Sequence, residues 1–381
     1  MSSERPAVSS QALSPQPLSP EERAGHVAVE RAMAELRSGR AVLLEHGEAR
    51  ALVLGAEAID TESAARLAAV APLRARLALP APRLTHLGLP RTQPGTIALP
   101  GIAPARVETL ALQVDARIDA PVSGAEPLDA GALELLRLAL VLPAAVVAPV
   151  ETGTPPSDAL RVSLCDVLAH RGRQARSLRI VGRAPVPLDG APKTEFVVFR
   201  GGEGLRDQVA VVVGTPDLSR PVPVRLHSAC LTGDLFGSLK CDCGDQLRDT
   251  VARMAAGAGG ILLYLDQEGR GNGIANKMRA YKLQSEGMDT YDADEVLGFG
   301  LDQRRFDFAA QMLRMLGVEK VELHTNNPEK IAALKAAGLT VAAEARVLGR
   351  PTQENVRYLA AKRDRAGHHI DFDALAARIS E

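Results

Sequence analysis

Short apolar runs alternate with helical patterns along the second half of this 381-residue chain, and this alternation constrains the fold more than any other feature. Runs rich in Val, Ile and Leu predict strands at residues 195–200, 209–213, 222–226, 261–264 and 321–324. Helical patterns follow two of these runs, from about Ile274 to Glu286 and from Pro328 to a stop at Gly338, with Asn327 as the cap of the second helix. Strands that alternate with helices predict an α/β or α+β fold, in which helices pack on a mixed sheet.

The first half of the chain shows patterns of the same kinds, less regularly spaced. They predict helices that begin at Glu21 or span 61–70, 129–142 and 160–170, and strands at 41–44 and 51–54. The Pro-rich stretch 80–128 is expected to form strands and loops, and the Pro- and Ser-rich residues 1–20 are expected to form a disordered tail. Because a chain of this length usually contains about two domains, we expect two, each a mixed β-sheet packed with helices.

Composition excludes several classes of partner. Aromatic residues make up 3% of the chain and Trp is absent, which argues against a surface that stacks nucleic-acid bases. A formal net charge of −1 provides no field that attracts nucleic acid or an anionic membrane. No run reaches the ~18 consecutive apolar residues of a membrane span, and the N-terminus lacks the pattern of a secretory signal. We therefore expect a cytoplasmic protein that binds neither nucleic acid nor membranes.

Three of the four cysteines cluster as Cys230, Cys241 and Cys243. In a reducing compartment such a cluster indicates metal binding or catalysis rather than disulfides. Three thiolates leave one position of a tetrahedral zinc ion open for water, which is the arrangement of a catalytic site. The spacing leaves two alternatives open: a structural zinc ion completed by His227, or three buried thiols without a metal.

Two segments have features that suit a bound phosphate. The run QEGRGNG at 267–273 has three glycines that let the backbone approach a ligand closely, and Arg270 can hold a phosphate in its planar fork. A plain flexible connection is the alternative interpretation of this run. The helix that starts at Pro328 exposes free N–H groups to an anion, and Lys330 adds a positive charge there.

A third segment, LGFGLDQRRF at 297–306, precedes another helical pattern. Asp302 is expected to cap this helix, so that Arg304 and Arg305 occupy its first turn. Because the helix dipole disfavours cations at that end, a guanidinium in the first turn indicates an anion nearby, such as a phosphate.

The order and spacing of these segments together resemble GTP cyclohydrolase II, the family that opens the purine ring of GTP at the start of riboflavin synthesis. The resemblance extends from near Arg179 to His369. Its segments are RLHSACLTGD (225–234), SLKCDCGDQL (238–247), YLDQEGRGNGIANKMRAY (264–281), DTYDAD (289–294), LGFGLDQRRF (297–306), TNNPEK (325–330) and YLAAKRDRAGH (358–368).

The resemblance implies a role for each matching residue. The implied ligands of one zinc ion per subunit are Cys230, Cys241 and Cys243. It also implies that Asp302 accepts a proton, that Arg304 is the nucleophile toward the α-phosphate and that Tyr281 lies close to the reaction. Contacts with GTP are implied for Arg225, Leu226, His227, Ser228, Ala229, Gln246, Glu268, Gly269, Arg270, Thr290, Thr325 and Lys330.

The implied products are formate, pyrophosphate and 2,5-diamino-6-(ribosylamino)-4(3H)-pyrimidinone 5′-phosphate, with Mg²⁺ on the triphosphate and a homodimer as the usual assembly. These residue types suit the reaction, because zinc lowers the pKa of bound water, polar side chains move protons and cations stabilise departing pyrophosphate. A guanidinium has a pKa above ~12 and no free lone pair at neutral pH. We therefore expect Arg304 to stabilise charge at the phosphate rather than to attack it.

Three positions depart from the family pattern. Ala229 stands where the family usually has Glu, Asp266 where it has Arg, and Asn272 where it has an aliphatic residue. The implied zinc ligands and catalytic residues are all retained, so we expect ring opening to survive. The departures also fit a divergent relative that opens the same ring in another pathway, such as pyrimidine catabolism. A regulator that binds a nucleotide without turnover is an alternative of a different class.

The N-terminal half resembles 3,4-dihydroxy-2-butanone 4-phosphate synthase, which riboflavin enzymes often carry ahead of the cyclohydrolase. The matching segments are SGRAVLL (38–44), ALVLGAEAIDTESAARLA (51–68) and LALPAPRLTHLGLP (77–90). The acidic metal-binding loop expected between the first two is reduced to EHGEAR, which lacks most of the carboxylates that Mg²⁺ needs. The expected division is a tail at 1–20, a degenerate and catalytically silent synthase-like domain at 21–178, and a GTP cyclohydrolase II domain at 179–381.

Overall fold

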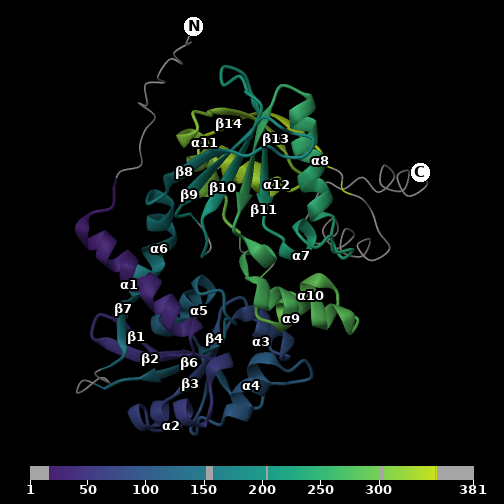
Figure 1. The fold of residues 1–381 in the computed structure, drawn as a ribbon. Helices are drawn as coiled ribbons and strands as arrows, with labels where there is room; N and C mark the ends of the chain where they lie inside the picture. The colour runs from purple at the N-terminus through teal and green to yellow at the C-terminus, as the bar shows by residue number, and fades with distance from the viewer. Residues whose placement is uncertain (1–16, 152–157, 203–204, 301–303, 348, 350–381) are drawn as a thin grey trace.

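The computed structural model describes residues 17–151, 158–202, 205–300, 304–347 and 349. Within these ranges the chain forms two seven-stranded sheets, each mixed in strand direction and covered by helices, which confirms the expected fold class (Figure 1). None of the helices in these ranges has the length and apolar character that a membrane crossing requires.

The first sheet has the strand order β5-β4-β3-β6-β2-β1-β7. Its strands are β1 (Val42–His46), β2 (Ala49–Gly55), β3 (Arg76–Leu79), β4 (Gly95–Ala98), β5 (Val122–Gly124), β6 (Ala145–Pro149) and β7 (Leu160–Ser163). Only the β1–β7 pair is parallel among these strands. Because side chains alternate along a strand, the pair Leu43–Leu52 lies in one core and the pair Val42–Val53 in the other, so both faces are buried.

Helices cover both faces of this sheet. One core is closed by α1 (Pro20–Arg37), α5 (Pro127–Leu138) and α6 (Leu164–Arg176). The other is closed by α2 (Thr61–Val70), α3 (Ala81–His86) and α4 (Pro104–Leu112), with the short turn η1 (Ala56–Ala58) beside them. The helix α1 begins at Pro20, one residue before the predicted Glu21, and Ser19 and Glu22 cap each other's backbone N–H groups at its first turn, so residues 19 and 20 belong to this helix start and not to the expected tail.

Two expectations for this half are wrong. The stretch 80–128 contains helices α3 and α4 as well as strands, because Pro82 and Pro104 occupy first-turn positions, where a missing N–H breaks no helical hydrogen bond. Residues 160–163 form strand β7, not the start of a helix, since they pair with β1 and the helix begins only after the Ser163 cap. The pairing of β7 carries the first sheet past the polar segment 151–158.

The second sheet has the order β14-β13-β11-β12-β10-β9-β8. Its strands are β8 (Arg179–Pro185), β9 (Thr194–Arg200), β10 (Gln208–Val213), β11 (Val222–Ser228), β12 (Gly260–Leu265), β13 (Lys320–His324) and β14 (Thr340–Ala345). All five strands predicted for this half are present. The neighbours β12, β11, β13 and β14 are parallel, and the β8, β9, β10 side is antiparallel.

The elements around this sheet are α7 (Leu231–Asp234), α8 (Cys243–Ala256), η2 (Glu268–Gly271), α9 (Ile274–Ser285), α10 (Thr290–Val296), α11 (Asp307–Met315) and α12 (Pro328–Ala336). Helices α11 and α12 close one core and α8 closes the other. Asn327 caps α12 as predicted, accepting the N–H of Glu329 at 2.9 Å.

The expected position of the arginines before α11 is wrong. This helix begins at Asp307, with the buried Phe306 at its cap position, so Arg304 and Arg305 precede the helix and do not occupy its first turn. The residue in the first turn is the acidic Asp307, which the helix dipole favours. Asp302 lies outside the described residues.

The two halves share a core. Helices α9 and α10 extend from the second half and lie beside α3 of the first half (Figure 1). Their residues Ala280, Leu283 and Val296 are buried in the same apolar cluster as Leu84 and Leu87.

Candidate active site

The candidate site lies where three parallel strands end. β11 ends at Ser228, β12 at Leu265 and β13 at His324, and parallel neighbours bring these ends to one edge of the sheet. Ligands of α/β sheets usually bind at this edge. Three segments singled out from the sequence, although far apart in the chain, follow these strand ends directly.

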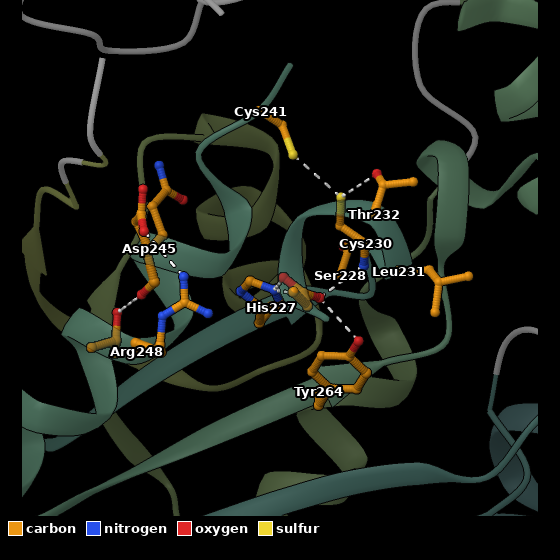
Figure 2. Close-up of polar contacts among 12 residues, drawn as sticks. His227, Ser228, Cys230, Leu231, Thr232, Cys241, Asp245, Arg248 and Tyr264 are labelled. Carbon is orange, nitrogen blue, oxygen red and sulfur yellow. Dashed lines mark hydrogen bonds and ion pairs between the residues drawn. The ribbon is translucent and has the colours of Figure 1, made fainter. Parts of the chain in front are cut away.

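The three cysteines meet just beyond β11. Their sulfur atoms all lie within 4.8 Å of one another, and those of Cys230 and Cys241 are 3.6 Å apart. Figure 2 shows the side chains of Cys230 and Cys241 pointing toward one another. A tetrahedral zinc ion with Zn–S bonds of about 2.3 Å holds its sulfur ligands about 3.8 Å apart, so this spacing fits zinc. A Cβ on Gly233 would lie 2.6 Å from the sulfur of Cys241, which explains why a glycine stands there.

Within the described residues, the candidate metal site consists of the three cysteines. Among the described residues it is the only group of three or more His, Cys, Asp or Glu side chains close enough to hold a metal ion, and it does not include His227. Hydrogen bonds from the other two cysteines lower the pKa of Cys230, whereas the neighbouring sulfurs and burial raise the pKa of Cys243. Sulfur atoms this close favour one shared cation, because they cannot all be anionic without it.

Lys277 on α9 stands beside this cluster, and sequence reasoning missed it. Its ammonium lies 3.2 Å from the sulfur of Cys230 and 2.8 Å from Oε1 of Glu268. It also donates to Oγ1 of Thr232 at 3.0 Å. Burial lowers the pKa of Lys277, but the sulfur, the Tyr281 hydroxyl and the carboxylate outweigh it and raise the pKa above that of an ordinary lysine. The one available signal was its position inside the matching segment 264–281.

His227 takes part in a buried network of its own. Its Nε2 lies 3.0 Å from a carboxylate oxygen of Asp234, and its ring stacks on Tyr264. Asp234 also accepts the Cys230 N–H and the Tyr264 hydroxyl, both at 2.9 Å. Burial lowers the pKa of His227, so the ring is neutral at pH 7. This arrangement orients the backbone of the first cysteine and uses His227 to hold Asp234 instead of a metal.

Arg225 lies deeper along β11. Its Nη2 donates to Oε1 of Gln246 at 2.6 Å, and Gln246 donates in turn to Asp242 at 2.5 Å. Burial lowers the pKa of Arg225 to about 10, although Asp242 and Cys243 oppose that shift, and the guanidinium remains cationic at pH 7. A buried positive charge beside the cysteine cluster suits an anionic ligand.

The glycine-rich loop after β12 forms the short turn η2. Gly269 and Arg270 both have φ of 60°, a left-handed conformation that costs Gly269 nothing and strains Arg270. The guanidinium of Arg270 donates to Asp294 at 3.0 Å and lies 4.5 Å from the ring centroid of Tyr291. These contacts attach the loop to α10, the helix that begins at Thr290.

The third strand end contributes Thr325 and Lys330. Nζ of Lys330 donates to the carbonyl of Leu226 at 2.6 Å, and Thr325 accepts the N–H of Asn327 at 3.0 Å. The side chain of Leu226 is fully buried in the core, so this residue offers the site only its backbone.

Two of the three implied catalytic residues are described. Nη1 of Arg304 donates to Oγ of Ser228 at 3.3 Å, which brings that arginine to the end of β11. The ring of Tyr281 lies 5.4 Å from Nζ of Lys277. The third, Asp302, falls outside the described residues.

Two family departures have a local structural explanation. Asp266 accepts the backbone N–H groups of Leu205 and Arg206, both at 2.9 Å, and pairs with the Arg206 guanidinium, so it anchors a neighbouring loop. Ala229 is buried and donates its N–H to the carbonyl of Leu265. Nothing in the structure explains Asn272.

The fold and the site together define an α/β protein in which a cysteine cluster spaced to hold a metal ion and buried cations meet at the ends of parallel strands. The family model of GTP cyclohydrolase II matches residues 179–346. A GTP cyclohydrolase-2 of Xylella fastidiosa is 47% identical over 353 residues, covering 91% of this chain and 88% of the relative. The chain therefore belongs to the GTP cyclohydrolase II family, as the sequence resemblance predicts.

Some relatives match only about half of the chain. A GTP cyclohydrolase-2 of Aliivibrio fischeri is 48% identical over 180 residues, covering 47% of this chain and 89% of the relative. A solved two-domain 3,4-dihydroxy-2-butanone 4-phosphate synthase from A. baumannii covers 84% of this chain and 99% of its own, at 18% identity and a TM-score of 0.32. A structural similarity this low supports no inference.

Proposed function

We propose that this chain hydrolyses GTP, opening the imidazole ring and releasing formate and pyrophosphate to give 2,5-diamino-6-(ribosylamino)-4(3H)-pyrimidinone 5′-phosphate, the first step of riboflavin biosynthesis. The observation that carries the proposal is the meeting of three cysteine sulfurs within 4.8 Å of one another, in a chain of the GTP cyclohydrolase II family.

The proposed metal is one zinc ion per subunit, held by Cys230, Cys241 and Cys243. Bound there, zinc supplies a Lewis acid that generates hydroxide from water at neutral pH. Lys277 balances the negative charge of the thiolates, and the network around Asp234 fixes the backbone of the first ligand.

The proposed substrate contacts divide into two groups. Arg270, Arg304 and Lys330 supply positive charge for the triphosphate, with Mg²⁺ sharing that role. The remaining proposed contacts with GTP are Arg225, Leu226, His227, Ser228, Ala229, Gln246, Glu268, Gly269, Thr290 and Thr325. Because Leu226 and Ala229 are buried, their contribution is through the backbone.

Proton transfer is assigned to Asp302, with Tyr281 close to the reacting atoms. Arg304 stabilises charge on the α-phosphate as pyrophosphate leaves, because a guanidinium lacks the free lone pair of a nucleophile. The protein is proposed to work in the cytoplasm as a homodimer, as its family usually does.

We also propose that residues 21–178 form a synthase-like domain without butanone-phosphate synthase activity, and that residues 179–381 form the cyclohydrolase domain. The turn between β1 and β2 is short, and the carboxylate of Glu45 lies 3.4 Å from Arg50 and 3.9 Å from Arg161. A carboxylate neutralised in this way is a poor ligand for Mg²⁺.

Formate release from GTP tests the proposed function. Purified full-length protein with zinc, Mg²⁺ and GTP is expected to release formate and pyrophosphate together and to form a pyrimidine product, followed by its absorbance. The variant Cys241→Ser is expected to lose both zinc and formate release, whereas Cys165→Ser, at an exposed cysteine outside the cluster, retains both.

Two results would contradict the proposal. Active protein without stoichiometric zinc would show that the reaction does not need zinc. Full formate release by Cys241→Ser would show that the proposed set of zinc ligands is wrong. GTP binding without formate release would instead identify a nucleotide-binding regulator.

A further inference from the structure

Arg83, on α3 of the first half, is a buried arginine whose guanidinium is directed at helix ends. Its side chain is 1% exposed. Its Nε donates to the carbonyl of Leu110 at 2.8 Å, and its Nη2 donates to those of Thr109 at 3.2 Å and Gln113 at 2.8 Å. These carbonyls belong to the last turn and cap of α4, where a helix runs out of N–H partners, although the carbonyl of Thr109 also accepts the N–H of the cap residue Gln113.

The fourth acceptor of Arg83 lies in the other half of the chain. Nη1 donates to the carbonyl of Val296 at 2.9 Å, and Val296 is the last residue of α10. A single cation therefore lies at the negative ends of two helix dipoles, one from each half of the chain. Burial lowers the pKa of Arg83 to about 10, so it remains charged at neutral pH.

The rest of the contact between the two halves of the chain is also close-packed. Helices α9 and α10 and the residues directly after α10 are buried in the core of the first sheet through Ala280, Leu283, Ala293, Val296, Leu297 and Phe299. Gly298 has φ of +81°, and a Cβ there would lie 2.7 Å from Cγ of Pro80. Arg279 pairs with Glu57 across the same boundary at 2.8 Å.

The same two helices carry parts of the candidate site. Thr290 begins α10, and Tyr281 lies on α9. Two residues before Val296, Asp294 accepts from the guanidinium of Arg270 at 3.0 Å. A displacement of the end of α10 therefore moves the partner of the glycine-rich loop.

We propose that the first half of the chain supports GTP turnover by fixing α10, and that Arg83 is the positioning residue that does so. It acts through the Val296 carbonyl and Asp294 on Arg270, and it touches neither substrate nor metal. The inference rests on the proposed function, since it assigns Arg270 and Thr290 to GTP.

The test compares Arg83→Met with Arg106→Met in the full-length protein. Arg106 is the control, because it pairs with Asp119 at 2.8 Å and, among the described residues, all its hydrogen bonds stay within the first half. For Arg83→Met we expect kcat/KM for GTP to fall about 10- to 100-fold, mainly through KM, with zinc content unchanged. For Arg106→Met we expect no change in KM.

Hydrogen exchange without GTP supplies a readout that is independent of activity. Loss of Arg83 is expected to increase amide exchange in 290–297 but not in α8, which carries Cys243. If Arg83→Met is not recovered folded, Arg83→Lys takes its place, since it keeps the charge with fewer donors. It is expected to show an intermediate KM and intermediate exchange.

The inference would be overturned by an unchanged KM with unchanged exchange in 290–297, or by equal losses in the Arg106 control. A lower melting temperature with normal KM would show that Arg83 only stabilises the fold, and would also overturn it. Absence of formate release from the wild-type chain would refute the proposed function instead, while hydrogen exchange would still report whether Arg83 fixes α10.

Discussion

Lys277 balances the buried negative charge around the cysteines. It is the common partner of the Cys230 sulfur and the Glu268 carboxylate, at 3.2 and 2.8 Å. Glu268 also accepts the N–H of Leu231 at 2.6 Å, which ties the glycine-rich loop to the first cysteine segment. Removing one member of such a group leaves the other charges buried without compensation.

Lys277→Met is therefore expected to lower formate release at least tenfold and the free energy of unfolding by about 3–5 kcal/mol. Zinc content, formate release and urea denaturation measure the effect. Lys282→Met is the control, because Lys282 is an exposed lysine on the same helix. Equal behaviour of the two variants would show that Lys277 has no special role.

Arg304 gives a second prediction at this scale. Its Nη1 lies 3.3 Å from Oγ of Ser228, and its guanidinium lies over the ring of Phe306. If charge at the phosphate is its role, Arg304→Lys retains measurable turnover, reduced about tenfold, and Arg304→Met loses far more. Trapping a covalent adduct between Arg304 and GMP would contradict this role.

At the scale of elements, α1 and α6 meet through two stacked histidines. His26 and His170 have ring centroids 4.5 Å apart, and His170 is fully buried. Burial lowers the pKa of His170 to about 4, helped by His26, Arg171 and Arg173 and opposed by Glu30. The folded protein therefore keeps this ring neutral where the unfolded chain is protonated.

This contact predicts acid sensitivity. Between the unfolded pKa of about 6.5 and the folded pKa of about 4, the unfolded chain binds the extra proton, so the free energy of unfolding falls as the pH falls. The expected loss from His170 is about 3 kcal/mol across that window, and none above it. Urea denaturation at several pH values measures this loss. If the free energy of unfolding of His170→Leu falls with pH as steeply as that of the unmodified protein, the loss does not come from His170.

Local sequence patterns predicted where helices and strands begin, except where strand pairing or burial of a side chain determined the boundary. Asn327 and Ser19 cap their helices because a cap needs only its own next few residues. Residues 160–163 became β7 because β1 offered an unpaired edge, which no local pattern reveals. Arg304 and Arg305 precede α11 because burial of Phe306 sets where that helix begins.

At the scale of the whole molecule, we propose that the first half supports the second instead of adding a separate reaction. The contact between the two halves around Arg83 buries the apolar residues of α9 and α10, the helices that carry Tyr281 and Thr290.

Incubation of the full-length protein with ribulose 5-phosphate and Mg²⁺ is expected to give no 3,4-dihydroxy-2-butanone 4-phosphate. The reason is the short β1–β2 turn, where Glu45 faces Arg50 and Arg161. Phosphorus NMR of the reaction mixture detects the product, and GTP turnover in the same sample shows that the protein is active. Clear formation of the butanone phosphate would mean that this half is a second enzyme.

The sequence by itself determined five of the seven strands of the second sheet, most helices, the cysteine cluster and the family, because periodicity, capping and motif spacing depend on neighbouring residues; it did not indicate β8 and β14 at the two edges of that sheet. Only the tertiary structure decided that β11, β12 and β13 end side by side, that Lys277 neutralises Cys230, and that Arg83 reaches Val296. Such contacts join residues with no local relation in the chain. They exist because parallel pairing and burial of apolar faces bring those residues together, and a buried charge then has to find a partner.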